Sequence, residues 1–278
     1  MRVILRPKNW RIDAFAVKPV VLGPNFFDGA PDHTQTFWGV WVTKTKTQGF
    51  VKQWDLYYLG LDRKYVQYEQ GTARERRNTV GINVHEQAGA IAFFQESDWQ
   101  FGTFDSGRIL AWKFAGGISY LVPAVPFQPT LSLKGAVSSG DRNPGSLDLQ
   151  TTNPLFPSGL YYGYMPFTNG SANAVVAHPA LNLHLSEKVS LNVESFSFWR
   201  QTIADGLYGQ NGGFIFPGQK SQARYVGSTQ DVSVGWHPDR HATVALTAAY
   251  YEAGPYLRET LSSAKNITYF SVLVSYNF

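Results

Sequence analysis

The chain has 278 residues, of which 16% are charged and 15% aromatic, with no cysteine and a formal net charge of +4. Soluble domains average about 25% charged residues, so this composition is unusual for a soluble protein. No apolar run reaches the roughly 18 residues of a membrane-spanning helix, which excludes a helical membrane protein. The small net charge and the absence of a clustered basic face give no support for a nucleic-acid partner.

The first segment, Met1 to Lys8, lacks the apolar core and the small-residue cleavage site of a secretory signal. We therefore expect either that a signal has been removed or that further sequence lies upstream. The absence of cysteine fits one large domain outside the reducing cytoplasm.

Alternating apolar and polar residues predict about twelve strands separated by turn-rich stretches. In chain order the predicted strands are 9–20, 35–44, 50–60, 76–85, 89–101, 107–122, 128–138, 172–185, 187–200, 224–236, 241–252 and 266–278.

The connections between these segments tend to alternate between short and long. The predicted long connections are 21–34, 61–75, 139–171, 201–223 and 253–265, with 102–106 as an exception. Such alternation is typical of a membrane β-barrel, with short turns at one rim and long loops at the other.

Most predicted strands have one apolar face. Leu131 and Leu133 alternate with Ser132 and Lys134, and the segments at 107–122 and 187–200 show the same pattern. We expect the apolar face to meet lipid and the polar face to meet water in a lumen. Residues 38–42 are apolar on both faces and leave their register undecided.

The last strand places Phe270, Val272, Val274, Tyr276 and Phe278 on one face. An aromatic strand at the carboxyl terminus resembles the segment by which outer-membrane barrels are recognised for assembly. The partners predicted on this basis are the barrel-assembly machinery, outer-membrane lipid and lipopolysaccharide. An ordinary sheet-closing strand is the alternative reading.

Several short motifs, taken in order, resemble the alginate export family of outer-membrane proteins. They are Asp55-Leu56-Tyr57-Tyr58-Leu59-Gly60-Leu61-Asp62, Arg77-Asn78-Thr79-Val80-Gly81, Gln100-Phe101-Gly102, Ala111-Trp112, Ser139-Gly140-Asp141, Asp148, Asn153-Pro154-Leu155-Phe156-Pro157, Gly159-Leu160-Tyr161-Tyr162-Gly163, Phe198-Trp199-Arg200 and Asp205-Gly206-Leu207-Tyr208.

This resemblance implies an antiparallel transmembrane β-barrel in the cell outer membrane that passes an anionic polysaccharide such as alginate or its oligomers. Family members have about eighteen strands. Residues 1–278 are then interpreted as the carboxy-terminal part of such a barrel, lacking a signal peptide and about six amino-terminal strands. A closed barrel of twelve strands is the alternative, because bacterial barrels take even strand numbers from eight upward.

The predicted lumen carries both signs of charge. The cations are Arg77, Lys113, Lys134 and Arg200, and the anions are Asp55, Glu96, Asp98, Glu194 and Asp231. The resemblance implies an electropositive constriction, in which Arg77 and Arg200 would face the substrate and the loop after Arg200 would fold inward. The alternative is that each arginine pairs with a lumen carboxylate and braces the barrel wall. The mixed charge also keeps open a generic porin for small solutes.

An enzymatic function has weaker support. Glu96 and Asp98 share one strand face, but their spacing alone does not indicate the paired carboxylates of a glycosidase. No Ser and His pairing stands out on a lipid-facing strand, as a barrel phospholipase would need. We therefore expect a transport protein.

The sequence predicts no cofactor and no metal site. The six histidines lack the spacing of a zinc site. Asp141, Asn143 and Asp148 offer oxygen atoms in the longest loop, without the regular spacing of a calcium loop, and are interpreted as solvated loop residues.

Overall fold

The computed structural model describes residues 1–21, 28–45, 52–155 and 172–277, and its main feature is one antiparallel sheet of thirteen strands. The strands are β1 (Arg2–Leu5), β2 (Trp10–Val17), β5 (Gln35–Thr45), β6 (Gln53–Tyr68), β7 (Gly71–Ala88), β8 (Ile91–Phe104), β9 (Gly107–Leu121), β10 (Thr130–Ser138), β11 (Ala174–His184), β12 (Val189–Arg200), β15 (Tyr225–Trp236), β16 (Ala242–Ala253) and β17 (Ile267–Tyr276).

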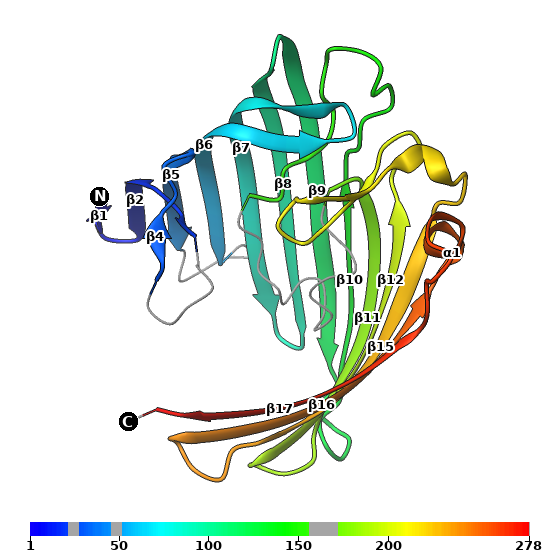
Figure 1. The fold of residues 1–278 in the computed structure, drawn as a ribbon. Helices are drawn as coiled ribbons and strands as arrows, with labels where there is room; N and C mark the ends of the chain where they lie inside the picture. The colour runs from blue at the N-terminus through cyan, green and yellow to red at the C-terminus, as the bar shows by residue number, and fades with distance from the viewer. Residues whose placement is uncertain (22–27, 46–51, 156–171, 278) are drawn as a thin grey trace.

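Each strand in this sheet pairs with the next one along the chain, and the sheet bends into an open trough (Figure 1). The all-β, antiparallel fold predicted from alternation is confirmed, and every one of the twelve predicted segments overlaps a strand of the sheet. The short strand β1 was not predicted, because its four residues are too few to show a period of two.

The predicted long connection at 61–75 is wrong. Strands β6 and β7 continue through this segment and meet at a tight turn, with Tyr68 opposite Gly71. The polar residues that suggested a loop are paired across the hairpin: Asp62 lies 2.6 Å from Arg74, and Arg63 lies 2.6 Å from Glu75. Cross-strand pairs of opposite charge stabilise a hairpin, so charged residues here do not end the strands.

The other long connections lie where they were predicted, after β10, β12 and β16. The connection after β12 contains the two-stranded β13 (Leu207–Tyr208) and β14 (Phe214–Phe216) and the 3-10 helix η2 (Gly218–Lys220), and the connection after β16 contains α1 (Pro255–Thr260). A second small hairpin, β3 (Val20–Val21) with β4 (Ala30–Pro31), follows β2. Among the described residues, no helix is long and apolar enough to cross a bilayer.

The two faces of the sheet separate as the alternation predicts. Phe270, Val272 and Val274 of β17 are 75%, 70% and 69% exposed, and Leu133 of β10 is 57% exposed. The opposite face carries the buried polar residues, among them Arg77, Gln100 and Asp98. We call the apolar side the outer face and the polar side the inner face.

The sheet does not close on itself within the described residues. Its edges are β1 and β17, and neither strand pairs with the other. The final aromatic residue of the predicted terminal strand, Phe278, lies outside the described residues, as do 46–51 and most of the loop motif at 156–163.

The separation of faces predicts opposite effects for two neighbouring substitutions on β10. Leu133→Arg would place a charge on the outer face and should cost about 2–4 kcal/mol in a bilayer, whereas Ser132→Arg would place it in the lumen and should cost about 1 kcal/mol or less. Reversible unfolding in lipid vesicles measures both values. Equal losses of unfolding free energy would contradict the assignment of faces.

Candidate functional site

The inner face is the candidate site, because polar side chains from many strands face one side of the trough there. The strand register places Tyr57, Asp98, Lys113 and Arg200 on neighbouring or nearby strands at similar heights. Directly opposite residues of antiparallel strands share a face, so these groups line one surface.

The connection after β10 folds onto this inner face. Leu149 forms a bridge with Ile109 beyond the end of β10, and its side chain is fully buried. Farther along, Gln100 accepts a hydrogen bond from the backbone N–H of Asn153 at 2.9 Å and donates one to the Asn153 carbonyl at 2.8 Å. Residues 149–153 therefore cross the inner face of the sheet near the ends of β7, β8 and β9.

The connection after β12 also folds inward, toward the opposite side of the trough (Figure 1). The backbone N–H of Gly218 donates to the Glu69 carboxylate at 3.0 Å, and the Tyr208 hydroxyl accepts from the Glu69 N–H at 3.1 Å. Glu69 lies in the β6–β7 turn, so this connection contacts a hairpin whose strands are five and six positions from β12 in the sheet order. The inward folding predicted for this loop is confirmed for its described residues.

Asp205 ties the two inward connections together. Its carboxylate accepts hydrogen bonds from the Asp141 N–H at 2.7 Å, the Thr151 hydroxyl at 2.6 Å and the Tyr208 hydroxyl at 2.6 Å. Burial raises the pKa of Asp205, and burial together with the nearby Asp205 charge raises the pKa of Asp141. The hydrogen bonds offset part of this desolvation cost.

Arg200 is fully buried beneath these connections. Its guanidinium donates to the carbonyls of Ile203 at 2.9 Å, Gly218 at 2.9 Å and Ser221 at 2.7 Å, and it lies 4.1 Å from the centre of the Tyr256 ring. Five N–H donors on one planar group can satisfy several carbonyls of an irregular loop at once. This geometry favours the bracing role over contact with a substrate.

Arg77 is held in the same manner on β7. It is 1% exposed, lies 2.6 Å from Glu75, and donates to the carbonyl of Thr151 at 3.1 Å. Glu75 also binds Arg63 at 2.6 Å, so one buried carboxylate serves two arginines. The predicted pairing with a carboxylate is present, and it joins the wall to the inward connection.

The remaining predicted lumen residues lie farther along the inner face. Lys113 is 3.3 Å from Glu96, which also accepts a hydrogen bond from the Tyr57 hydroxyl at 3.1 Å. Glu194 is 3.7 Å from His178, whose ring stacks on Phe196 at 3.8 Å. Asp98 is buried and Lys134 half-buried on the same face. Glu96 and Glu194 thus lie beside basic groups from neighbouring strands, whereas Asp55 accepts from the side-chain amide of Gln53.

Sequence reasoning missed the residues that fix the inward connections, chiefly Gln100, Glu69 and Asn173. Asn173 donates to the carbonyls of Thr202, Asp205 and Gly206, and its own side-chain oxygen accepts from the Thr202 N–H at 2.8 Å. Only Gln100 stood within a quoted motif. An isolated polar residue at a strand end carries no periodic signal of such a role.

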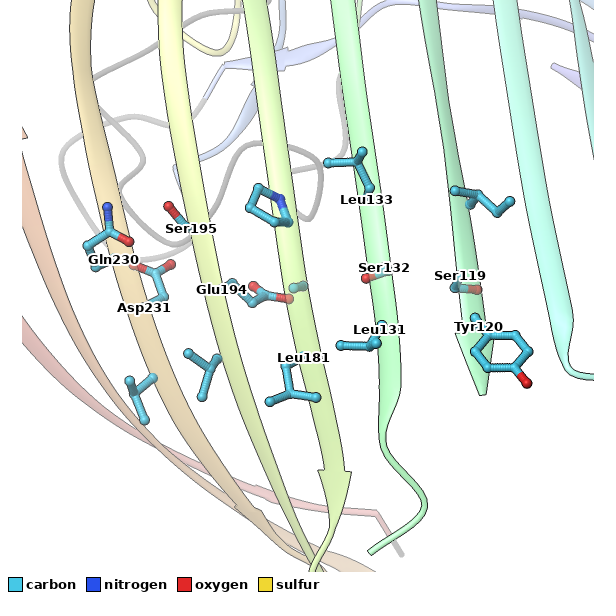
Figure 2. A pocket seen from close by; sticks show the side chains of 15 residues that line it. Ser119, Tyr120, Leu131, Ser132, Leu133, Leu181, Glu194, Ser195, Gln230 and Asp231 are labelled. Atoms are coloured by element: carbon cyan, nitrogen blue, oxygen red, sulfur yellow. The ribbon is translucent and has the colours of Figure 1, made fainter. Parts of the chain in front are cut away.

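A shallow hollow of about 610 Å³ crosses the strands from β9 to β15 (Figure 2). In Figure 2, Ser132 lies between Leu131 and Leu133 on β10, and Glu194 of β12 and Asp231 of β15 continue the same row beyond β11. Residues of both faces line this hollow because the side chains of Ser119, Ser132 and Ala180 are small.

No metal centre is formed by the candidate calcium ligands. Asp148 pairs with Arg108 at 2.6 Å, and Asp141 accepts from the Asn143 N–H at 2.9 Å and from the Gln70 side-chain amide. In the part of the chain that the structure describes, no group of three or more His, Cys, Asp or Glu side chains is arranged to hold a metal ion.

Comparison with protein-family models identifies the chain. The model for alginate export matches residues 1–270, nearly the whole sequence. The chain belongs to the alginate export family. It is accordingly an outer-membrane channel protein rather than a member of an enzyme family. A search of curated protein sequences found no match.

Solved porin structures resemble the fold at low identity. OccK11 (OpdR) of Pseudomonas aeruginosa shares 13% identity at a TM-score of 0.47, with 99% of this chain and 79% of that chain covered. OccK10 (OpdN) of the same organism shares 14% at 0.46, covering 98% and 81%. The NanC porin shares 8% at 0.40, covering 88% and 94%. These likenesses are too low to transfer a substrate or a residue role.

The buried position of Arg200 predicts the behaviour of a substituted channel. Arg200→Met would leave several loop carbonyls without donors and should cost about 3 kcal/mol or more, releasing the connection after β12. We expect a larger single-channel conductance with an unchanged reversal potential in planar bilayers. Arg108→Met, which removes an exposed arginine, is the control. A changed ion selectivity with unchanged conductance would instead support contact between Arg200 and permeating ions.

Proposed function

We propose that this chain forms the wall of an outer-membrane channel for an anionic polysaccharide such as alginate or its oligomers. The observation that carries the proposal is the pair of inward connections, fixed by Asp205, Arg200 and Arg77, on the inner face of an alginate export family sheet. Loops anchored in this way narrow a lumen, and the narrowing does not depend on the curvature of the sheet. A narrow, fixed passage suits a linear chain that enters end-on.

The charges of the inner face support passage of an anion. Glu96 lies beside Lys113, and Glu194 lies beside His178. Pairing reduces the repulsion that these carboxylates would exert on a polyanion. The basic partners in these pairs would act as successive weak sites. Weak sites let a charged polymer bind and leave, as conduction requires.

The proposal requires no chemical step and no cofactor. Transport is passive, driven by the gradient of the polymer along the lumen. The outer face would contact lipid and lipopolysaccharide, and β17 would present the assembly signal to the barrel-assembly machinery.

A sealed channel requires partners for both edges of the sheet. Unpaired N–H and C=O groups of β1 and β17 would each cost several kcal/mol in lipid. We infer that further strands pair with both edges. A barrel of about eighteen strands, which the family resemblance implies, would contain such strands. Residues 1–278 would then form the carboxy-terminal part of one barrel domain.

Polymer-dependent blockage of current tests the proposed substrate class. With the full chain in planar bilayers, mannuronate oligomers should interrupt the ion current at concentrations at least tenfold lower than neutral mannan oligomers of equal length, because each charge-assisted contact adds more than a neutral one. Increasing salt should weaken this difference. Equal blockage by both oligomers would favour the generic porin.

A further inference from the structure

A groove of about 710 Å³ lies on the inner face of β1, β2 and β5, away from the inward connections. Its lining combines two arginines with three aromatic rings: Arg2, Arg11, Phe15, Phe37 and Trp41. By strand register all of these residues share the face that carries Tyr57 and Lys113. No residue of this groove was among the predicted site residues.

The two arginines of the groove are fixed by one carboxylate. Asp13 lies 2.6 Å from Arg2 and 2.6 Å from Arg11, and its side chain is 10% exposed. The arginine side chains are 56% and 44% exposed. Asp13 holds both guanidinium groups in place and neutralises only one of the two charges. One positive charge and several N–H donors therefore face the groove.

The aromatic side of the groove is equally well positioned. Asp13 lies opposite Trp41, and Trp41 lies opposite Tyr57 in the neighbouring strand. The Trp41 and Tyr57 rings stack at 4.3 Å with an angle of 5° between their planes, and the Tyr57 hydroxyl donates to Glu96. Gly81 provides the space for the Tyr57 ring, since a Cβ there would lie 2.1 Å from it. Trp41 is thus a supported, partly buried platform.

We propose that this groove binds a sugar acid, with the pyranose ring against the aromatic surface and its carboxylate on Arg2 and Arg11. A flat ring surface favours the C–H face of a sugar, and a planar guanidinium matches the geometry of a carboxylate. Thr43 and Gln53 add polar groups along the same groove for ring hydroxyls. The inference rests on the proposed function and adds a specific holding site to the channel, separate from the narrowed region.

The groove also lies in line with other charged residues of the lumen. Trp41 and Tyr57 stand in the row that continues through Gly81 and Asp98 to Lys113. A polymer with one residue in the groove would therefore extend along a row that carries Asp98 and Lys113, the latter beside Glu96. A site of moderate affinity at this point would raise the local concentration of polymer without trapping it.

Binding of a matched pair of sugars tests the groove. The probes are the trisaccharide of β-1,4-linked mannuronate and its neutral counterpart mannotriose, titrated by calorimetry into the full chain in detergent micelles. The first variant is Arg2→Gln with Arg11→Gln and Asp13→Asn, in which the third change avoids an unpaired buried carboxylate. The second is Trp41→Leu. Arg108→Gln, with the same net change of one charge, is the control.

The triple variant should bind the mannuronate trisaccharide about tenfold more weakly and mannotriose as the wild type does. Trp41→Leu should weaken both sugars, and Arg108→Gln neither. Wild-type binding by the triple variant would overturn the groove, and if polymer still blocks the current the proposed function stands alone. If the wild-type channel neither binds the trisaccharide nor is blocked by the polymer, both proposals fail. Arg11→Lys should give intermediate affinity, because it retains the charge without the planar fork.

Discussion

The structure depends on one constraint: in lipid, every backbone N–H and C=O group needs a partner inside the protein. Between the two edges of its sheet, the chain meets it by pairing each strand with the next in antiparallel order, from β1 to β17. Because side chains then alternate between two faces, one set of residues meets hydrocarbon and the other is free to be polar. The polar face of the trough, with its carboxylates and arginines, exists because the backbone pairing has already been satisfied by the sheet.

A second constraint acts at the end of the trough, where the chain leaves the sheet. The connections after β10 and β12 have irregular backbones whose carbonyls cannot pair within a sheet. Arg200 and Arg77 supply donors to these carbonyls, and Asp205 accepts hydrogen bonds from both connections. Buried charges are costly unless they are paired or hydrogen-bonded, and each of these three groups is hydrogen-bonded, while Arg77 also pairs with Glu75. The same interactions that satisfy the backbone hold the connections across the lumen.

The inner face divides into parts with different chemistry. Near the inward connections, the charged groups are buried and serve the structure. At the groove of β1, β2 and β5, Arg2 and Arg11 remain about half exposed beside Trp41. Under the proposed function, a permeating anion would meet the exposed groups and not the buried ones. This difference in exposure favours Arg2 and Arg11 as the arginines that contact substrate. The sequence motifs alone instead favour Arg77 and Arg200.

The sequence by itself determined the strands, their faces and the family. A period of two is a local property, so the alternation of Leu131, Ser132 and Leu133 predicts both a strand and its orientation. The connection at 61–75 escaped this reasoning because Asp62 and Arg63 look like loop residues until Arg74 and Glu75 are placed opposite them. The burial of Arg77 and Arg200 and the exposure of Arg11 were decided only by the tertiary structure. Burial depends on which distant segment covers a side chain, and neither Gly218 near Glu69 nor Asp205 near Thr151 is implied by their positions in the chain.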